Sequence, residues 1–212
     1  MHLGLLFVTL LTADPNAQGF AEYKKGNYAK AAPLFEKALK ADRKNVWAWL
    51  NRARTLALLA KGKEPDEYCD YPKNWVLLAL DALEHAAELD KPKLLAKLKE
   101  EDPGTAALQA RPEVRAWLAA VTYDGDAAKL LAANPDWHST EEPGAVPRSL
   151  TLDPKSWKAS GNQVTLTEGG KSVKYELKVQ GWYFDEGKRH FSTLQLDGPT
   201  VWQLGALAAD CD

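Results

Sequence analysis

The sequence has few of the residues from which chemistry is most easily predicted. Its 212 residues include two cysteines, one methionine and four histidines, and the spacing of the cysteines and histidines matches no zinc-binding pattern. Lys and Arg number 27 against 29 Asp and Glu, so no basic excess indicates a nucleic-acid partner. No apolar run is long enough to span a bilayer as a helix. We therefore expect no bound metal or cofactor, no nucleic acid and no membrane span.

Catalytic motifs are also missing from the sequence. It contains neither a Gly-x-Ser-x-Gly nucleophile nor a glycine-rich loop for phosphate. His85, His138 and His190 have the chemistry of an acid or base, but none has a partner at an informative spacing. We predict that the protein is not an enzyme. An enzyme that pairs His190 with a nearby carboxylate is kept as an alternative.

The N-terminus and the two cysteines bear on the compartment. Leu3–Leu11 is an apolar run with the length of a signal-peptide core, and Leu11-Thr12-Ala13 is typical of a cleavage site, so residues 1–13 are a candidate signal peptide. Cys69 and Cys211 fit one disulfide of an exported protein, worth about 4–5 kcal/mol in the chain-entropy model. The sequence therefore favours a periplasmic or secreted protein. A cytoplasmic protein with two unrelated thiols and an uncleaved, packed N-terminus is the alternative.

One helical pattern occurs twice with a single fixed offset. The pattern consists of three small or apolar residues followed by an aspartate. Its first copy is Ala31, Phe35, Ala38 and Asp42, and its second copy is Ala79, Leu83, Ala86 and Asp90. A fixed offset over four positions indicates that one packing unit is used twice. Repeat arrays usually present binding surfaces, because each unit stacks on its neighbours and leaves one face open.

The first copy carries a specific motif. Residues 26–39 read Gly-Asn-Tyr-x-x-Ala-x-x-x-Phe-x-x-Ala-Leu, and residues 16–90 as a whole resemble the tetratricopeptide repeat family. The resemblance implies antiparallel helix pairs whose first helices line a concave groove for a peptide or protein segment. The residues that would line it are Phe20, Tyr23, Trp47, Leu50, Asn51 and Arg54. The other interpretation is that the aromatic residues pack against later parts of the chain.

Helical periodicity extends over residues 14–133. We predict helices at Asn16–Lys25, Tyr28–Ala41, Val46–Ala60, Asn74–Leu89, Lys93–Glu100, Glu113–Val121 and Asp126–Ala133. Pro92, Pro103 and Pro112 are interpreted as breaks between helices. Residues 134–148 contain several prolines and are interpreted as a linker between the helical domain and a second domain.

The periodicity changes to two in residues 149–212, which predicts an antiparallel β domain. Gly169-Gly170 suits a two-residue hairpin turn, and that turn pairs Leu166 with Val173, Val164 with Tyr175 and Glu168 with Lys171. Gly181 interrupts the alternation and predicts a bulge or bend. We expect about five or six strands in a rolled sheet or barrel. The fold class is therefore α+β, with the helices first.

These patterns favour an exported, non-enzymatic interaction or scaffold protein that binds a peptide or protein segment in the helical groove. The alternative is a carrier of a small apolar ligand, because the β domain is loosely similar to lipocalin-like bacterial barrels. The carrier hypothesis predicts a cavity inside the sheet lined by Tyr175, Leu177 and Trp182. The oligomeric state stays open.

Overall fold

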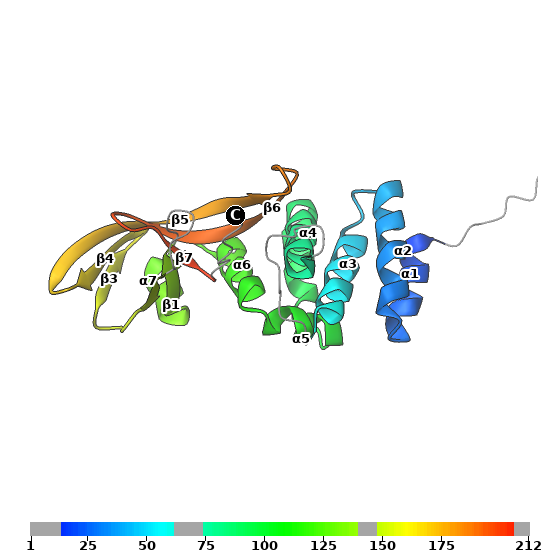
Figure 1. The fold of residues 1–212 in the computed structure, drawn as a ribbon, viewed down its shortest axis with the longest axis horizontal. Coiled ribbons are helices and arrows are strands. Elements are labelled where there is room, and N and C mark those ends of the chain that lie inside the picture. The colour runs from blue at the N-terminus through cyan, green and yellow to red at the C-terminus, as the bar shows by residue number, and fades with distance from the viewer. Residues whose placement is uncertain (1–13, 62–73, 140–147, 206–212) are drawn as a thin grey trace, which may run out of the picture.

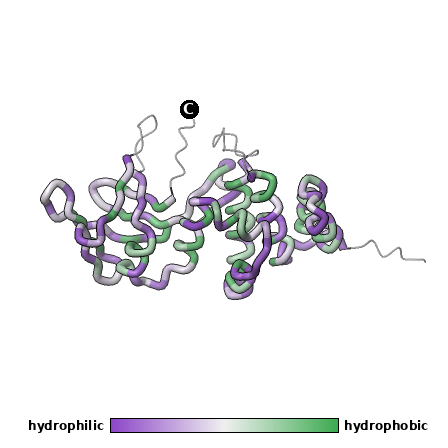
Figure 2. The backbone as a smooth tube through the Cα atoms, turned by 90° about the horizontal axis from the view of Figure 1, so that it is seen from below, coloured by the Kyte–Doolittle hydropathy of each residue, from purple (hydrophilic) through white to green (hydrophobic). Residues whose placement is uncertain are grey.

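A computed structural model describes residues 14–61, 74–139 and 148–205 (Figure 1). The described chain forms helices first and one antiparallel sheet second, which confirms the predicted α+β class. The two parts lie end to end along the long axis, and apolar segments run through both of them (Figure 2). The candidate signal peptide, residues 1–13, and both cysteines, Cys69 and Cys211, lie outside the described residues.

The helical part is an array of consecutive helices. They are α1 (Pro15–Lys24), α2 (Tyr28–Ala41), α3 (Val46–Leu59), α4 (Trp75–Lys97), α5 (Pro103–Ala110), α6 (Pro112–Thr122) and α7 (Ala127–Ala133). Most of them begin after an Asp or Asn whose side chain accepts a hydrogen bond from a first-turn N–H, which satisfies a backbone donor that the helix leaves free. These caps are Asp14, Asn45, Asn74, Asp102 and Asp126.

One feature of the array agrees with the prediction and one differs. The helices expected at Asn74–Leu89 and Lys93–Glu100 are the two helical segments of α4, separated ahead of Pro92 by a kink at Asp90, whose backbone is not helical (φ −160°, ψ 79°). Helix α5 was not predicted, because Pro103 was interpreted as a break. Proline is tolerated at the first helical position, where its missing N–H would have no partner, and here it directly follows the cap.

The sheet has seven strands among the described residues, in the order β2-β1-β7-β6-β5-β4-β3, and all neighbours are antiparallel. They are β1 (Asp136–Ser139), β2 (Ser149–Thr151), β3 (Trp157–Ser160), β4 (Gln163–Glu168), β5 (Lys171–Phe184), β6 (Arg189–Asp197) and β7 (Trp202–Leu204). The prediction of a linker at 134–148 is corrected for strand β1, which pairs with both β2 and β7. This strand has only four residues, and the prolines in the segment favoured the prediction of a linker.

The predicted hairpin register is confirmed: Leu166 faces Val173, and Val164 faces Tyr175. The bulge predicted at Gly181 is wrong, because β5 and β6 stay in continuous register through that residue. Instead, the ring of Tyr183 lies over Gly181, and a Cβ there would stand 2.8 Å from the Tyr183 Cε2 atom. Glycine at this position therefore allows a close approach of a side chain and does not mark a bulge.

Helices α6 and α7 fill the curved face of the sheet. Tyr175 and Leu177 are buried in one apolar cluster with side chains of both helices, such as Ala116 and Leu131. Trp182 instead stacks on Phe191. The three residues predicted to line a ligand cavity are therefore divided between two packed regions and do not surround an open space.

The end of the β5–β6 hairpin reaches beyond the sheet. Figure 1 shows the hairpin passing over α6 and arriving at α4. Phe184 and Phe191, near this end, are buried in the same apolar cluster as α3 and α4. This contact joins the sheet to the helical array and creates the junction described next.

Candidate functional site

The surface predicted as a peptide groove is covered by later parts of the chain. The Tyr23 hydroxyl donates to the Asp102 carboxylate (2.7 Å) and accepts from the Gly104 backbone N–H (3.1 Å). Burial, followed by the Asp102 hydrogen bond, raises the pKa of Tyr23, so the phenol stays protonated and can donate. Arg54 donates to the Thr105 hydroxyl (2.9 Å) and stands 3.4 Å from the Asp102 carboxylate. The start of α5 thus fills the space between α1 and α3.

The other predicted groove residues are also engaged within the chain. Leu50 is fully buried, and Asn51 is buried with its amide donating to Asn16 (3.4 Å). The ring of Trp47 lies under the Lys93 ammonium, 4.7 Å from the ring centroid. Phe20 is half-buried against Tyr23, with ring centroids 6.0 Å apart. The prediction of an open groove at these six residues is therefore corrected: four are core residues and two are half-covered.

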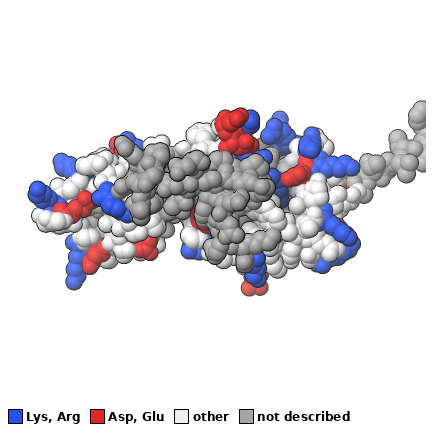
Figure 3. Space-filling view, in the orientation of Figure 1, with Lys and Arg blue, Asp and Glu red and all other residues white. Residues whose placement is uncertain are grey.

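An open cleft lies on the other side of α3, where the β5–β6 hairpin meets the helices. It has a volume of about 590 Å³. Its walls come from α2, the α2–α3 connection, α3, α4 and the turn after β5. Figure 3 shows acidic atoms over the hairpin turn beside Lys and Arg atoms over the helical array. The lining residues are Glu36, Leu39, Lys40, Arg43, Trp49, Arg52, Asp81, His85, Asp185, Lys188 and Arg189.

Two buried charges form the floor of the cleft. Arg52 donates to the Leu78 carbonyl (3.3 Å) and lies 3.6 Å from Glu36, and burial lowers the pKa of its guanidinium. Asp81 lies 3.5 Å from Arg189, and burial raises the pKa of its carboxyl against the opposing charges of His85 and Arg189. Its Oδ1 atom has no hydrogen-bond partner within the described residues. Asp81 also has a hydrogen bond with the His190 backbone. Buried charges in a cleft whose pKa values are shifted by burial mark a candidate functional site.

Aromatic side chains fix one wall of the cleft. The Trp49 ring packs on the His85 ring, with centroids 4.5 Å apart, and its indole N–H donates to the Arg43 carbonyl (2.9 Å). His85 also lies 3.6 Å from Asp81, one helical turn away on α4. These contacts order the wall before a ligand binds, so fewer side chains would lose conformational entropy on binding.

The hairpin turn that closes the cleft has a strained backbone. Asp185 and Glu186 both have left-handed conformations, with φ of 53° and 54°. A non-glycine residue in this region costs about 1–2 kcal/mol, and such strain collects at functional sites. The Arg189 side chain, which lines the cleft, pairs with Asp185 at 3.2 Å and helps to hold the turn. The tip is therefore a defined part of the cleft wall.

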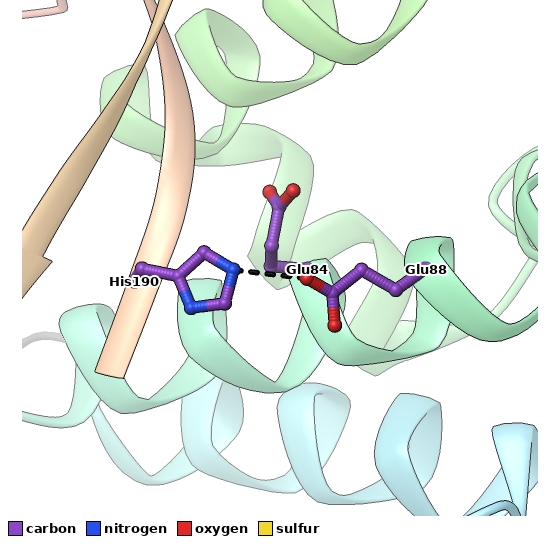
Figure 4. Close-up of side chains that lie close together, drawn as sticks. All are labelled: Glu84, Glu88 and His190. Atoms are coloured by element: carbon purple, nitrogen blue, oxygen red, sulfur yellow. Dashed lines mark hydrogen bonds and ion pairs between the residues drawn. The ribbon is translucent and has the colours of Figure 1, made fainter. Parts of the chain in front are cut away.

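A second polar cluster lies where α4 meets β6. His190 and Glu88 are 2.9 Å apart, and Glu84 lies one turn before Glu88 (Figure 4). The possible ligand atoms of these three residues all lie within 4.8 Å of one another, so this is the group that could hold a metal. The enzyme alternative requires His190 and a carboxylate to converge in one pocket. The pairing with Glu88 is present, but neither residue lines the open cleft.

Neither the cleft nor the α4–β6 cluster was predicted from the sequence. A polar helix face could have been recognised in the sequence, because side chains three and four residues apart lie on one side of a helix. The positions are 81, 84, 85 and 88. The spacing does not show what that face meets. The partner is β6, more than 100 residues later in the chain, and only the packed hairpin brings Arg189 and His190 to α4.

Comparisons of the chain with protein-family models, with curated proteins and with solved structures gave no match. Within 14–61, 74–139 and 148–205, no helix is both long and apolar enough to cross a membrane.

Proposed function

We propose that this protein is a non-enzymatic interaction protein that binds a short acidic segment of a partner protein in the cleft between the helices and the β5–β6 hairpin. The observation that carries the proposal is the lining of the cleft. Five of its residues are Lys or Arg and three are Asp or Glu. Asp81 and Asp185 both pair with Arg189, while Lys40 and Arg43 are exposed on the rim. The excess charge is therefore positive and faces outward.

The shape of the cleft supports a peptide ligand. A volume of about 590 Å³ falls within the usual range of ligand sites and holds a few side chains. Leu39 and Trp49 line the cleft beside the basic rim, each with a small exposed apolar edge (5% and 7% exposed). An apolar anchor flanked by charge is a common way to bind a segment of a partner, because the anchor gives affinity and the charges give orientation and rate.

In this function the repeat-like helices act as a scaffold, and the partner binds at a different surface from the predicted groove. The face around Arg54 is used to hold α5, so the cleft takes the role that the resemblance to tetratricopeptide repeats gave to the groove. The apolar start of the sequence and its two cysteines support an exported protein, and we include a periplasmic or secreted location in the proposal.

A selection of random peptides tests this function. Short peptides displayed on phage are selected against the wild-type chain, and the binding of the selected peptides is then measured on variants. We expect enrichment of Asp and Glu next to an apolar residue. We also expect the double variant Lys40→Glu, Arg43→Glu to bind at least about tenfold more weakly, because reversal of rim charges removes attraction and adds repulsion. The affinity for wild type should fall as salt rises.

The matched control reverses two exposed lysines far from the cleft, Lys155 and Lys158, to Glu. It changes the net charge equally and should leave peptide binding unchanged. Equal weakening by both double variants would show that only net charge matters. Selected peptides without acidic residues, or equal binding to wild type and to the rim variant, would refute the proposal.

A further inference from the structure

A carboxylate in the α4–β6 cluster is buried without a cation. Glu84 is 8% exposed. Its carboxylate accepts from the Ser192 backbone N–H (2.9 Å), the Ser192 hydroxyl (2.9 Å) and the Trp117 indole N–H (2.6 Å). All three donors are neutral. These hydrogen bonds satisfy both carboxylate oxygens but bring no opposite charge to them.

A second carboxylate lies one turn along the same helix. Glu88 contacts two histidines: one carboxylate oxygen is 2.9 Å from His190 Nε2, and the other is 3.3 Å from His85 Nδ1. In the described part of the chain, neither Glu84 nor Glu88 forms an ion pair with Lys or Arg. The cluster thus combines two carboxylates and an imidazole, a set of donors that suits a cation.

We propose that Glu84, Glu88 and His190 bind one divalent transition-metal ion, of which Zn²⁺ is the best match, and that the ion joins α4 to β6. One donor atom from each residue lies within 4.8 Å of the others. In Figure 4 His190 extends from β6 to the Glu88 carboxylate, and the Glu84 side chain starts beside this pair with its carboxylate directed away from it. Glu88 is exposed, so its side chain can rotate to place a carboxylate oxygen 2.0–2.2 Å from a zinc ion, which is the usual length of a zinc–oxygen bond.

The donor types select the class of metal. Calcium and magnesium prefer oxygen ligands, whereas an imidazole nitrogen with carboxylates suits zinc, manganese, cobalt and nickel. Three protein ligands leave a position for water on the exposed side of Glu88. The cluster also has outer partners of the kind that orient metal ligands: Trp117 and Ser192 hold Glu84, and His85 holds the second oxygen of Glu88.

Titration calorimetry on the full chain, stripped of metal with a chelator, tests the proposal with Zn²⁺ alone as the probe. We expect one equivalent to bind and the midpoint of thermal unfolding to rise with the zinc concentration. Glu88→Gln and His190→Gln should each weaken binding by at least about tenfold, because each removes a direct ligand. His138→Gln and Glu101→Gln, which alter the same residue types away from the cluster, should bind zinc as wild type does.

A measurement on the wild-type protein keeps the test independent of variant folding. In NMR spectra of the histidine rings, the signals of His190 should change first as zinc is added, in proportion to the amount bound. Absence of any bound equivalent would overturn the proposal, and so would unchanged binding by both ligand variants, or a first response at another histidine. None of these results depends on whether the cleft binds peptides.

Discussion

Arg52 and Arg54 lie two residues apart on α3 and are equally buried, each 6% exposed. Residues two apart point about 200° apart around a helix, so the two guanidinium groups face opposite sides of the array. Arg54 has close partners on its side: the Thr105 hydroxyl at 2.9 Å, the Lys97 carbonyl at 3.1 Å and the Asp102 carboxylate at 3.4 Å. Arg52 has longer contacts, to the Leu78 carbonyl at 3.3 Å and to Glu36 at 3.6 Å.

The difference separates a structural face from a candidate binding face. The Arg54 side is closed because α5 supplies a hydroxyl and α4 a carbonyl, each in hydrogen-bond range. The Arg52 side is an open cleft with an aspartate oxygen that lacks a hydrogen-bond partner among the described residues. A buried charge with matched partners contributes to stability through those partners, whereas one with long contacts is better placed to accept a ligand.

The largest effect is expected on the closed face. Arg54→Met keeps the aliphatic volume but removes the donors to Thr105 and Lys97 and the charge beside Asp102. Breaking a buried pair by removing one partner costs about 3–5 kcal/mol. Because Asp102 keeps its hydrogen bond from Tyr23, we expect the lower end, about 3 kcal/mol less free energy of unfolding. Urea unfolding followed by circular dichroism measures it. A loss below that of Arg52→Met would remove the contrast between the faces.

An intermediate effect is expected at the residue that lets α5 enter. A Cβ on Gly104 would overlap the Tyr23 hydroxyl and stand 2.6 Å from the Arg54 Cβ. Alanine is otherwise the better helix residue, so a neutral site would be stabilised by Gly→Ala. We expect Gly104→Ala to lose about 2 kcal/mol through overpacking. The double variant with Tyr23→Phe, which removes one of the two overlapping atoms, should cost less than the sum of the single variants. A stabilised Gly104→Ala protein would contradict the close packing.

The smallest effect is expected on the open face. Arg52→Met gives up two long contacts and leaves Asp81 with Arg189 and His85, so we expect a loss of about 1 kcal/mol or less in free energy of unfolding. The same variant should weaken the acidic peptides selected on wild type, because Arg52 is a charge on the cleft floor. Unfolding in urea and peptide titration are measured on one preparation. Intact peptide binding would exclude the cleft floor from recognition.

Local patterns allowed a large part of this fold to be predicted. Helix α2 begins at Tyr28 and ends at Ala41, as its apolar spacing indicated, and Gly169-Gly170 set the register of β4 and β5. Both features depend on residues close in sequence, where periodicity and turn chemistry act directly. Strand β1 and helix α5 were not predicted because both are short: β1 begins directly after Pro135, and α5 begins at Pro103. In both places the proline indicated a break in secondary structure more strongly than the few following residues indicated a strand or a helix.

The sequence by itself determined the fold class, most helices and the hairpin register, because these follow from side-chain period, caps and turns within a few residues. It did not determine which face of α3 stays open. Tyr23 and Arg54 are residue types that are common at binding surfaces. They are buried because α5 packs on them, through contacts between residues about 50 to 80 positions apart in the sequence. Likewise, Glu88 and His190 meet only because the hairpin passes over α6. Such contacts depend on how whole elements pack, and that is decided by the summed fit of many side chains in the tertiary structure.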